Sequence, residues 1–234
     1  MEAQESGVGG GPQAPKPNEF ASLGTIFVNP KGTFAAMAER PRYLVALIVL
    51  VVLMAAMGAY MFQSGVVRDE TIAKMEAKGT PQPQIDATAQ FFDSPMGLVF
   101  GTIGNVIGVP FAILVSAALL MFLGNLMLGA KLRFPHYLSA ATYGSVVGLV
   151  DHALRTALVV SKESLDIRLG AGILFGEELN FAGRVLDSMT DPFLLWSMAV
   201  TALGVAVYAR KGFGFGAIAV LPVFVVTLLL SAMR

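Results

Sequence analysis

Long uncharged apolar segments alternate with short charged segments along this chain. The first runs from Tyr43 to Phe62 without a charged residue and directly follows Arg40 and Arg42. A helix of about 20 apolar residues is long enough to cross a hydrocarbon core about 30 Å thick. The segment therefore predicts a membrane-spanning helix whose start is anchored by the two arginines.

The second apolar segment, Met96 to Ala130, is too long for one straight span. A helix of this length would extend about 52 Å at 1.5 Å per residue. Division into two spans would leave only Met96 to Val109 for the first, which is too short to cross. We predict one long helix that is kinked or broken at Pro110, with its early half tilted, interfacial or packed against protein.

The third apolar segment follows the basic turn Lys131 to His136 and extends from Tyr137 to about Val150. It is predicted to end where charged residues begin, at Asp151. The chain from there to Asp191 mixes apolar and charged residues, which is typical of short amphipathic helices along the membrane surface.

The last two spans form a predicted hairpin. The fourth opens with Asp191 as its N-cap and Pro192 at the first helical position, where the missing N–H of proline is not needed. After a glycine-rich turn, the fifth runs to Met233 with Pro222 inside. The pattern as a whole predicts an all-α integral membrane protein with five transmembrane helices.

The sequence also predicts the character of two segments that precede the first span. Residues 1–24 are rich in Gly, Pro, Gln and Glu, which predicts a disordered tail; residues 25–234 then form one five-span domain. The segment Asn29 to Glu39 places Phe34 and Met37 on one face, which predicts a short amphipathic helix on the inner membrane surface. Protein docking and a simple linker are both open roles for it.

Composition supports the membrane assignment and excludes some chemistry. Hydrophobic residues make up 55% of the chain and charged residues 14%, against about 25% charged in an average soluble domain. The absence of cysteine excludes disulfides, thiolate metal sites and cysteine nucleophiles. The net charge of zero gives no reason to expect nucleic acid. We expect no cofactor; the expected partners are the lipid bilayer and another membrane protein or a second copy.

Charge placement predicts the orientation. Basic residues flank the spans on the side that carries the N-terminus, and they favour the cytoplasmic side. The basic residues on that side are Lys16, Lys31, Arg40, Arg42, Lys131, Arg133, Arg210 and Lys211. We therefore predict a cytoplasmic N-terminus and, with an odd number of spans, an external C-terminus.

The most polar cluster near membrane depth is Asp151, His152 and Arg155. Asp151 and Arg155 are four residues apart, so on a helix they share a face and can pair. An interfacial salt bridge, a proton or substrate relay, and anchoring to a partner are the three interpretations. Catalysis here would need two facing carboxylates, a convergent set of metal ligands or a GxSxG motif. The sequence provides none of the three near membrane depth. We therefore predict a protein without catalytic activity.

Small and polar residues in the second span are candidates for helix packing. Glycine pairs allow close approach of a neighbouring helix, within the molecule or in a homodimer, and asparagines can hydrogen-bond between helices or line a polar cavity. The candidates are Gly97, Gly101, Gly104, Gly108, Asn105 and Asn125. At the inner turn, Lys131, Arg133 and His136 are candidates for lipid headgroup contact, although ordinary orientation signalling explains them equally well.

Several short segments together resemble the YIP-type membrane domain, a family named for interaction with Ypt/Rab GTPases. They are Ile26-Phe27-Val28-Asn29-Pro30 with Phe34 and Pro41, the segment LRFPHYLSAATYG entering the third span, the Asp191-Pro192-Phe193-Leu194-Leu195-Trp196 opening of the last hairpin, and the five-span layout. The resemblance covers the chain from Thr25 onward. A proline common in the third span of the family is absent, and Gly148 is predicted to provide the break there.

The resemblance implies a five-span domain with a cytoplasmic N-terminus. The short tail and the Ala/Gly/Val-rich spans are similar to the bacterial branch, so a GTPase partner is not carried over. We expect an accessory or interaction subunit in the bacterial cytoplasmic (inner) membrane, as part of an export-type ABC transporter. The alternative is a small permease or lipid-handling membrane protein.

Overall fold

The computed structural model describes residues 18–175 and 179–233. The regular elements of this part of the chain are all helical. In chain order they are α1 (Glu19–Val28), α2 (Pro30–Ala36), α3 (Leu44–Gln63), α4 (Val66–Ala77), α5 (Gln82–Phe92), α6 (Pro95–Met121), a π-helix (Phe122–Met127), α7 (Phe134–Lys162), a 3-10 turn (Ala171–Leu174), α8 (Phe181–Thr190), α9 (Pro192–Tyr208) and α10 (Phe213–Ala232).

Four of the described helices are long and apolar enough to cross a membrane: α3, α6 with its π-helical end, α7 and α10. The pair α8 and α9, bent by 58°, meets the same criteria together and supplies a fifth. The all-helical membrane fold predicted from the sequence is confirmed, with four spans or five when the bent pair is counted as one.

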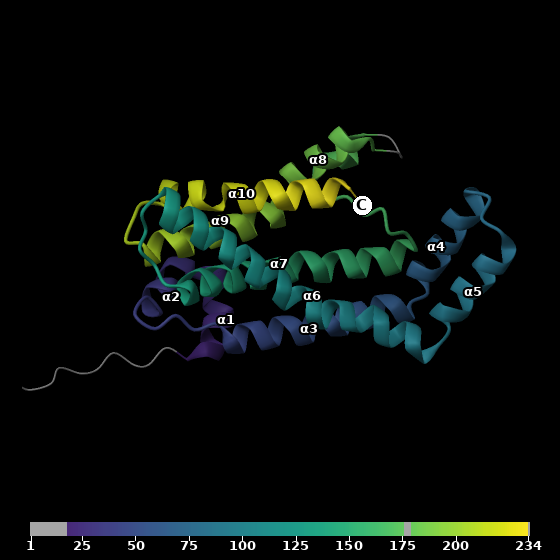
Figure 1. Cartoon of the computed structure of the whole chain (residues 1–234), viewed down its shortest axis with the longest axis horizontal. Coiled ribbons are helices and arrows are strands. Elements are labelled where there is room, and N and C mark those ends of the chain that lie inside the picture. Colours follow the sequence, from purple (N-terminus) through teal and green to yellow (C-terminus); the bar gives the residue numbers. More distant parts are fainter. Residues whose placement is uncertain (1–17, 176–178, 234) are drawn as a thin grey trace, which may run out of the picture.

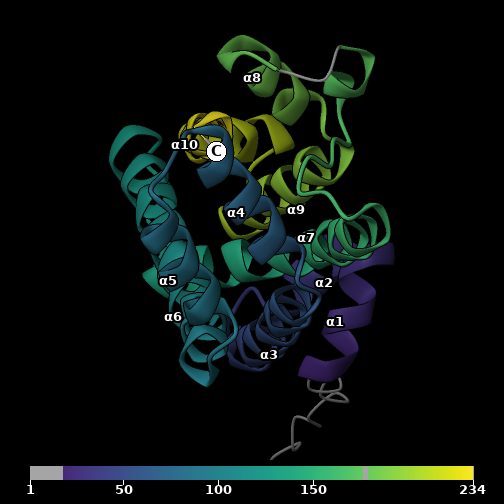
Figure 2. The same ribbon diagram turned by 90° about the vertical axis from the view of Figure 1, so that its right-hand side faces the viewer.

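The long helices lie side by side in one bundle, with different elements at its two ends (Figure 1). At one end, here called the near end, are α1, α2 and the turns before α7 and α10. At the other, the far end, are α4 and α5, which Figure 2 shows in front of the spans, and α8, which lies beside α10. Helix α7 contacts α3, α6 and α9, and α10 completes the bundle against α6 and α9.

Two glycines let these helices approach closely. A Cβ atom at Gly144 of α7 would lie 1.9 Å from Thr201 Oγ1 of α9, and one at Gly216 of α10 would lie 1.8 Å from the backbone oxygen of Ala202. Both distances are far below van der Waals contact. Only glycine therefore permits these crossings of α9 with its two neighbours.

Helix α6 runs without interruption through Pro110, so a break at that proline is wrong. Proline costs a backbone hydrogen bond, but in a membrane bundle neighbouring groups and small adjustments of the helix compensate for it. The irregularity comes later, in the π-helix that begins at Phe122. One face of the early half of α6 packs against protein, since Gly97 is buried beside Phe91 and Phe62.

Helix α7 extends to Lys162, well beyond its predicted end near Val150. The predicted end at Asp151 and the predicted break at Gly148 are both wrong. Asp151 pairs with Arg155 one turn later, so the two charges compensate each other on the helix surface and do not terminate it.

The pre-span helices are packed into the bundle more deeply than the predicted surface helix. Ile26, Phe34 and Met37 are fully buried, and α2 packs against α9. In the segment between α7 and α9, here called the third loop, α8 has the predicted amphipathic character, with Phe181 and Met189 exposed. Of the predicted tail, residues 1–17 lie outside the described residues. Helix α1 begins at Glu19, with the side chain of Asn18 as its cap.

Candidate functional site

Arg155 connects three segments at the far half of the bundle. Its Nε donates to Asp151 Oδ1 at 2.8 Å on the same helix, and its Nη1 donates to the backbone oxygen of Ile167 at 2.9 Å. Its Nη2 is paired with Asp191, at the start of α9. We call these four residues the Arg155 junction; it ties α7, the loop after it and α9 together.

Asp191 has two roles within this junction. Its Oδ1 accepts from the backbone N–H groups of Phe193 at 2.9 Å and Leu194 at 3.1 Å, which caps α9 as predicted. Its Oδ2 is paired with Arg155. Asp191 is only 3% exposed, and a buried carboxylate needs such partners because burial removes its hydration. The sequence indicated the cap and the Asp151–Arg155 pair separately, but not that one guanidinium joins them.

The junction is suited to holding helices together. The guanidinium is shared between two carboxylates and a carbonyl, so its donors are used within the protein. His152, the third residue of the predicted cluster, is exposed on α7. Among residues 18–175 and 179–233, no group of three His, Asp or Glu side chains is placed to hold a metal ion. This arrangement favours the salt-bridge interpretation of the cluster over a relay.

The two predicted glycine pairs of α6 lie in different surroundings. A Cβ atom at Gly97 would lie 2.1 Å from the backbone oxygen of Phe91, and one at Gly101 would lie 2.7 Å from the ring of Phe62. This pair is therefore used inside the molecule. A Cβ atom at Gly104 or Gly108 would meet nothing within 4 Å, so the second pair faces outward.

The two asparagines have local structural contacts. Asn125 accepts from Leu132 N at 2.9 Å and from the Tyr137 hydroxyl at 2.9 Å, and its Nδ2 donates to Leu132 O at 2.7 Å. It therefore closes the turn from α6 to α7. Asn105 lies against α3, where a Cβ atom at Gly58 would come within 2.1 Å of its Nδ2.

The three residues predicted to contact lipid headgroups differ in exposure. Lys131 and Arg133 are exposed at the near end. His136 is 8% exposed, and its ring nitrogens lie 3.2 Å from the backbone oxygens of Arg133 and Ala38. Both ring nitrogens of His136 face carbonyls inside the protein. Any contact with lipid headgroups at this turn is therefore made by Lys131 and Arg133.

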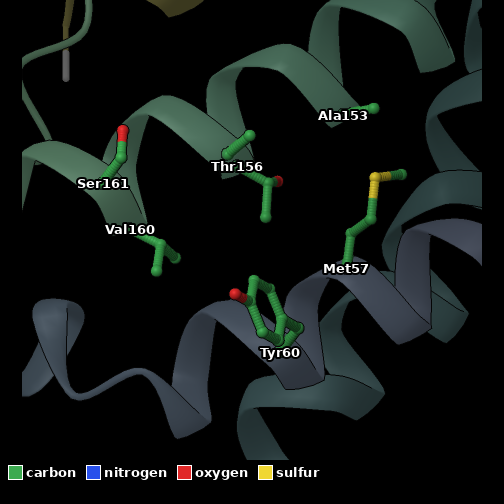
Figure 3. Close-up of a pocket in the computed structure, with 7 residues that line it drawn as sticks. Met57, Tyr60, Ala153, Thr156, Val160 and Ser161 are labelled. Atoms are coloured by element: carbon green, nitrogen blue, oxygen red, sulfur yellow. The ribbon is translucent and has the colours of Figure 1, made fainter.

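A cleft that the sequence did not indicate lies between the far ends of α3 and α7. Its deeper part has a volume of about 370 Å³ and is mainly apolar, at the lower end of the roughly 300–1,000 Å³ typical of ligand sites. Figure 3 shows Met57 and Tyr60 of α3 pointing toward Ala153, Thr156 and Val160 of α7. The lining residues are Met57, Tyr60, Ala153, Thr156, Ala157, Val160 and Ser161.

A polar cavity of about 550 Å³ adjoins this cleft and shares Tyr60 and Val160 with it. Its other lining residues are Gln63, Ser64, Val66, Asp69 and Glu163. No motif predicted the pair of cavities because their walls come from segments about a hundred positions apart. The only signal in the sequence was the tyrosine near the end of the first span.

A family model described as the Yip1 domain matches residues 24–233 of the chain. No curated protein and no solved structure matches it.

Proposed function

The chain belongs to the Yip1-domain family, and from that premise we propose that it acts as a non-catalytic accessory subunit that packs against another membrane protein. That it is a polytopic membrane protein follows from the family and from its apolar helices. The interaction role rests on the outward face of α6, and the Arg155 junction agrees with it because its charged groups are used to hold helices together.

The outward face of α6 carries the proposal. Gly104 and Gly108 lie one turn apart with open space beside them. Phe100 and Phe111 flank them and are 58% and 65% exposed. Small residues between large apolar ones let a second helix approach closely and gain van der Waals contact, which is the main attraction between helices in lipid. Helix α6 thus presents a surface shaped for a helix of another chain.

The open glycine pair is not needed for the fold itself. Several glycines of this chain, such as Gly101, Gly144 and Gly216, lie where a Cβ atom would collide with a neighbour. Gly104 and Gly108 have no such neighbour, and Gly in the middle of a helix is less favourable than Ala by roughly 1 kcal/mol. A partner helix provides the missing reason for both glycines.

The partner we propose is a subunit of an export-type ABC transporter in the bacterial cytoplasmic membrane. This choice follows the resemblance to bacterial members of the family, and the exposed apolar face of α6 requires a partner that is itself in the membrane. A soluble partner would leave that face in lipid.

Site-specific photocrosslinking in native membranes tests the proposal. A photoreactive residue at Ile107, on the α6 face and 64% exposed, is compared with one at Val52 of α3, which is 59% exposed. We expect a crosslinked band containing a second protein from position 107 only, and we expect Gly104→Leu and Gly108→Leu to abolish it. Because a Cβ atom at either glycine would meet nothing within 4 Å, both variants should fold and keep the wild-type melting temperature.

Two results would overturn this function. Crosslinking only to lipid at both positions would show that the face has no protein partner. A band at twice the mass of the 24.7 kDa chain would assign the face to a second copy in place of another subunit.

The permease alternative predicts a different role for Asp151. If Asp151, His152 and Arg155 formed a polar contact for a transported molecule, Asp151→Ala would lower flux in liposomes. We expect Asp151→Ala to lower stability, since it removes one of the carboxylates that hold Arg155, and to leave flux at the level of empty liposomes.

A further inference from the structure

The cleft between α3 and α7 changes in polarity along its length. The deeper part is lined by Met57, Ala153 and Ala157. The outer part is the adjoining polar cavity, which is lined by Gln63, Ser64 and Glu163 among others. Gln63 is the last residue of α3, so the change occurs where the apolar span ends. Tyr60, which borders both parts, lies one turn earlier, at the depth where aromatic residues with a polar tip are enriched. The cleft therefore crosses from hydrocarbon depth to headgroup depth.

Thr156 supplies a buried polar group aimed into the deeper part. It is 7% exposed and points into the gap between the helices (Figure 3). A threonine in a helix commonly donates to the carbonyl four residues earlier, as Thr142, Thr201 and Thr227 do here at 2.8–2.9 Å. Within the described part of the chain Thr156 makes no such bond, so its hydroxyl is available to a ligand in the cleft.

The outer part carries a negative charge without a partner. Asp69 is paired with Arg68 at 2.9 Å, and Arg68 also pairs with Asp93 at 3.1 Å. The side chain of Glu163 forms no ion pair or hydrogen bond with the residues that the structure describes, and the same holds for the side-chain amide of Gln63. The mouth is therefore complementary to a cation with N–H groups that can donate to a carboxylate and an amide oxygen.

We propose that this cleft binds a phospholipid with a primary-amine headgroup, of the phosphatidylethanolamine class. One acyl chain lies along Met57, Ala153 and Ala157, and the ammonium donates to Glu163 at the mouth. An amphiphile fits the change from apolar to polar at the end of the span. A protein helix does not, because one turn of a helix about 10–12 Å in diameter takes up more volume than the deeper part, which holds about 370 Å³. The site is separate from the α6 face on which the proposed function rests.

Native mass spectrometry of the full chain in detergent tests the proposal. The delipidated protein is titrated with phosphatidylethanolamine, phosphatidylcholine and phosphatidylglycerol of identical acyl chains. Phosphatidylcholine keeps the positive charge but has no N–H donor, and phosphatidylglycerol has no cation. We expect one equivalent of phosphatidylethanolamine to bind about tenfold more tightly than either, the effect of one charge-assisted hydrogen bond.

Two variants assign binding to the cleft. Glu163→Gln should reduce the preference for phosphatidylethanolamine to near unity, and Ala157→Trp should fill the apolar part and remove the bound equivalent. Leu154→Trp is the matched control, since Leu154 is on the same helix, is 38% exposed and does not line the cleft. It should bind as the wild type does.

Equal binding of the three lipids, or the same loss in Leu154→Trp as in Ala157→Trp, would overturn the proposal and indicate only non-specific lipid around the bundle. Appearance of dimer that Ala157→Trp abolishes would also overturn it and assign the cleft to a second copy. If Ala157→Trp fails to fold, Glu163→Gln alone decides, because retained preference for phosphatidylethanolamine in that variant contradicts the proposed headgroup contact.

Discussion

The near and far ends of the bundle are held together by different forces. At the near end, Phe34 and Tyr137 are fully buried, and the ring of Phe34 makes edge contacts with Tyr143 and Tyr208, with centroids 6.1 and 5.5 Å away. At the far end, exposed large apolar residues such as Ile173 and others of the third loop are common. Charged side chains connect several segments there, beside an aromatic cluster in which Phe62 of α3 stacks on Phe92 of α5.

Polar groups at the near end are paired inside the protein. The hydroxyls of Ser139 and Tyr208 are hydrogen-bonded at 2.8 Å, and Ser139 also donates to the backbone oxygen of Arg42 at 3.0 Å. His136 joins the backbone oxygen of Ala38 to the start of α7. These bonds fix the segment before the first span against α7 and α9.

At the far end, carboxylates fix loops by accepting from backbone N–H groups. Glu70 of α4 accepts from Leu165 in the third loop. Asp187 of α8 accepts from Gly170 and Gly172, both at 3.0 Å. Contacts of this kind are partly exposed, so water and salt weaken them. The stabilisation that comes from burying apolar groups is not weakened in this way. We therefore expect the near end to set the arrangement of the helices and the far end to be the adaptable one.

The largest expected contrast between the two ends is their accessibility across the membrane. The native chain has no cysteine, so a single introduced cysteine can be labelled without background from other positions. With an impermeant thiol reagent on intact cells, we expect labelling at Ser64 and Ser164 at the far end and none at Gly212 at the near end. The reason is the basic residues around the near-end turns, which favour the cytoplasm. The reverse pattern would place the near end outside, and labelling at all three positions in lysed cells is the control.

Among the substitutions that test stability, removal of a buried aromatic ring at the near end should cause the largest loss. Phe34→Ala should lower the free energy of unfolding by about 3–5 kcal/mol, because it leaves a cavity between α2, α7 and α9. Phe20→Ala is the matched control, since Phe20 is 67% exposed, and should change stability by less than about 0.5 kcal/mol. Unfolding in mixed micelles of rising SDS content measures both. Similar losses in the two variants would contradict a core at the near end.

Loss of the central cation of the Arg155 junction should have an intermediate effect. Arg155→Met should cost about 2–3 kcal/mol, since it leaves the buried Asp191 without its charged partner. Arg133→Met, at an exposed position of the near end, is the control and should be close to neutral. In a double-mutant cycle, Asp191→Asn should cost much less in the Arg155→Met background than in the wild type. Additive costs would show that the two residues do not interact.

The smallest expected effect is a pH dependence of the far end through Glu70. Partial burial raises the pKa of this carboxyl, but the N–H of Leu165 and the ammonium of Lys74 outweigh it and hold the pKa below its ordinary value of 4.5. The stabilisation is therefore complete above about pH 4.5 and is lost as the pH falls through the folded-state pKa, and it amounts to at most about 1 kcal/mol.

Hydrogen exchange of the third loop measures this effect. Protection of the Leu165 amide should fall as the pH is lowered below 4.5, after correction for the intrinsic exchange rate. Glu70→Gln should show low protection at every pH, and amides of α7 near Tyr143 should stay protected in both proteins. Protection at Leu165 that does not change with pH would show that Glu70 does not hold the loop.

Features that depend on apolar length or on local spacing were determined by the sequence itself. The spans follow from runs of apolar residues that match the membrane thickness. The cap at Asp191 and the Asp151–Arg155 pair follow from spacings of a few residues. Local rules suffice for these features because the interacting groups are neighbours on one helix or one turn.

Features that depend on which distant surfaces meet were decided only by the tertiary structure. Helix α7 continues past Asp151, and Asp191 comes within reach of Arg155 from another helix. Gly101 meets a ring while Gly104 meets nothing, although both belong to similar glycine pairs. A linear pattern gives the character of each helix face but not its neighbour, because neighbours are chosen by packing over the whole bundle.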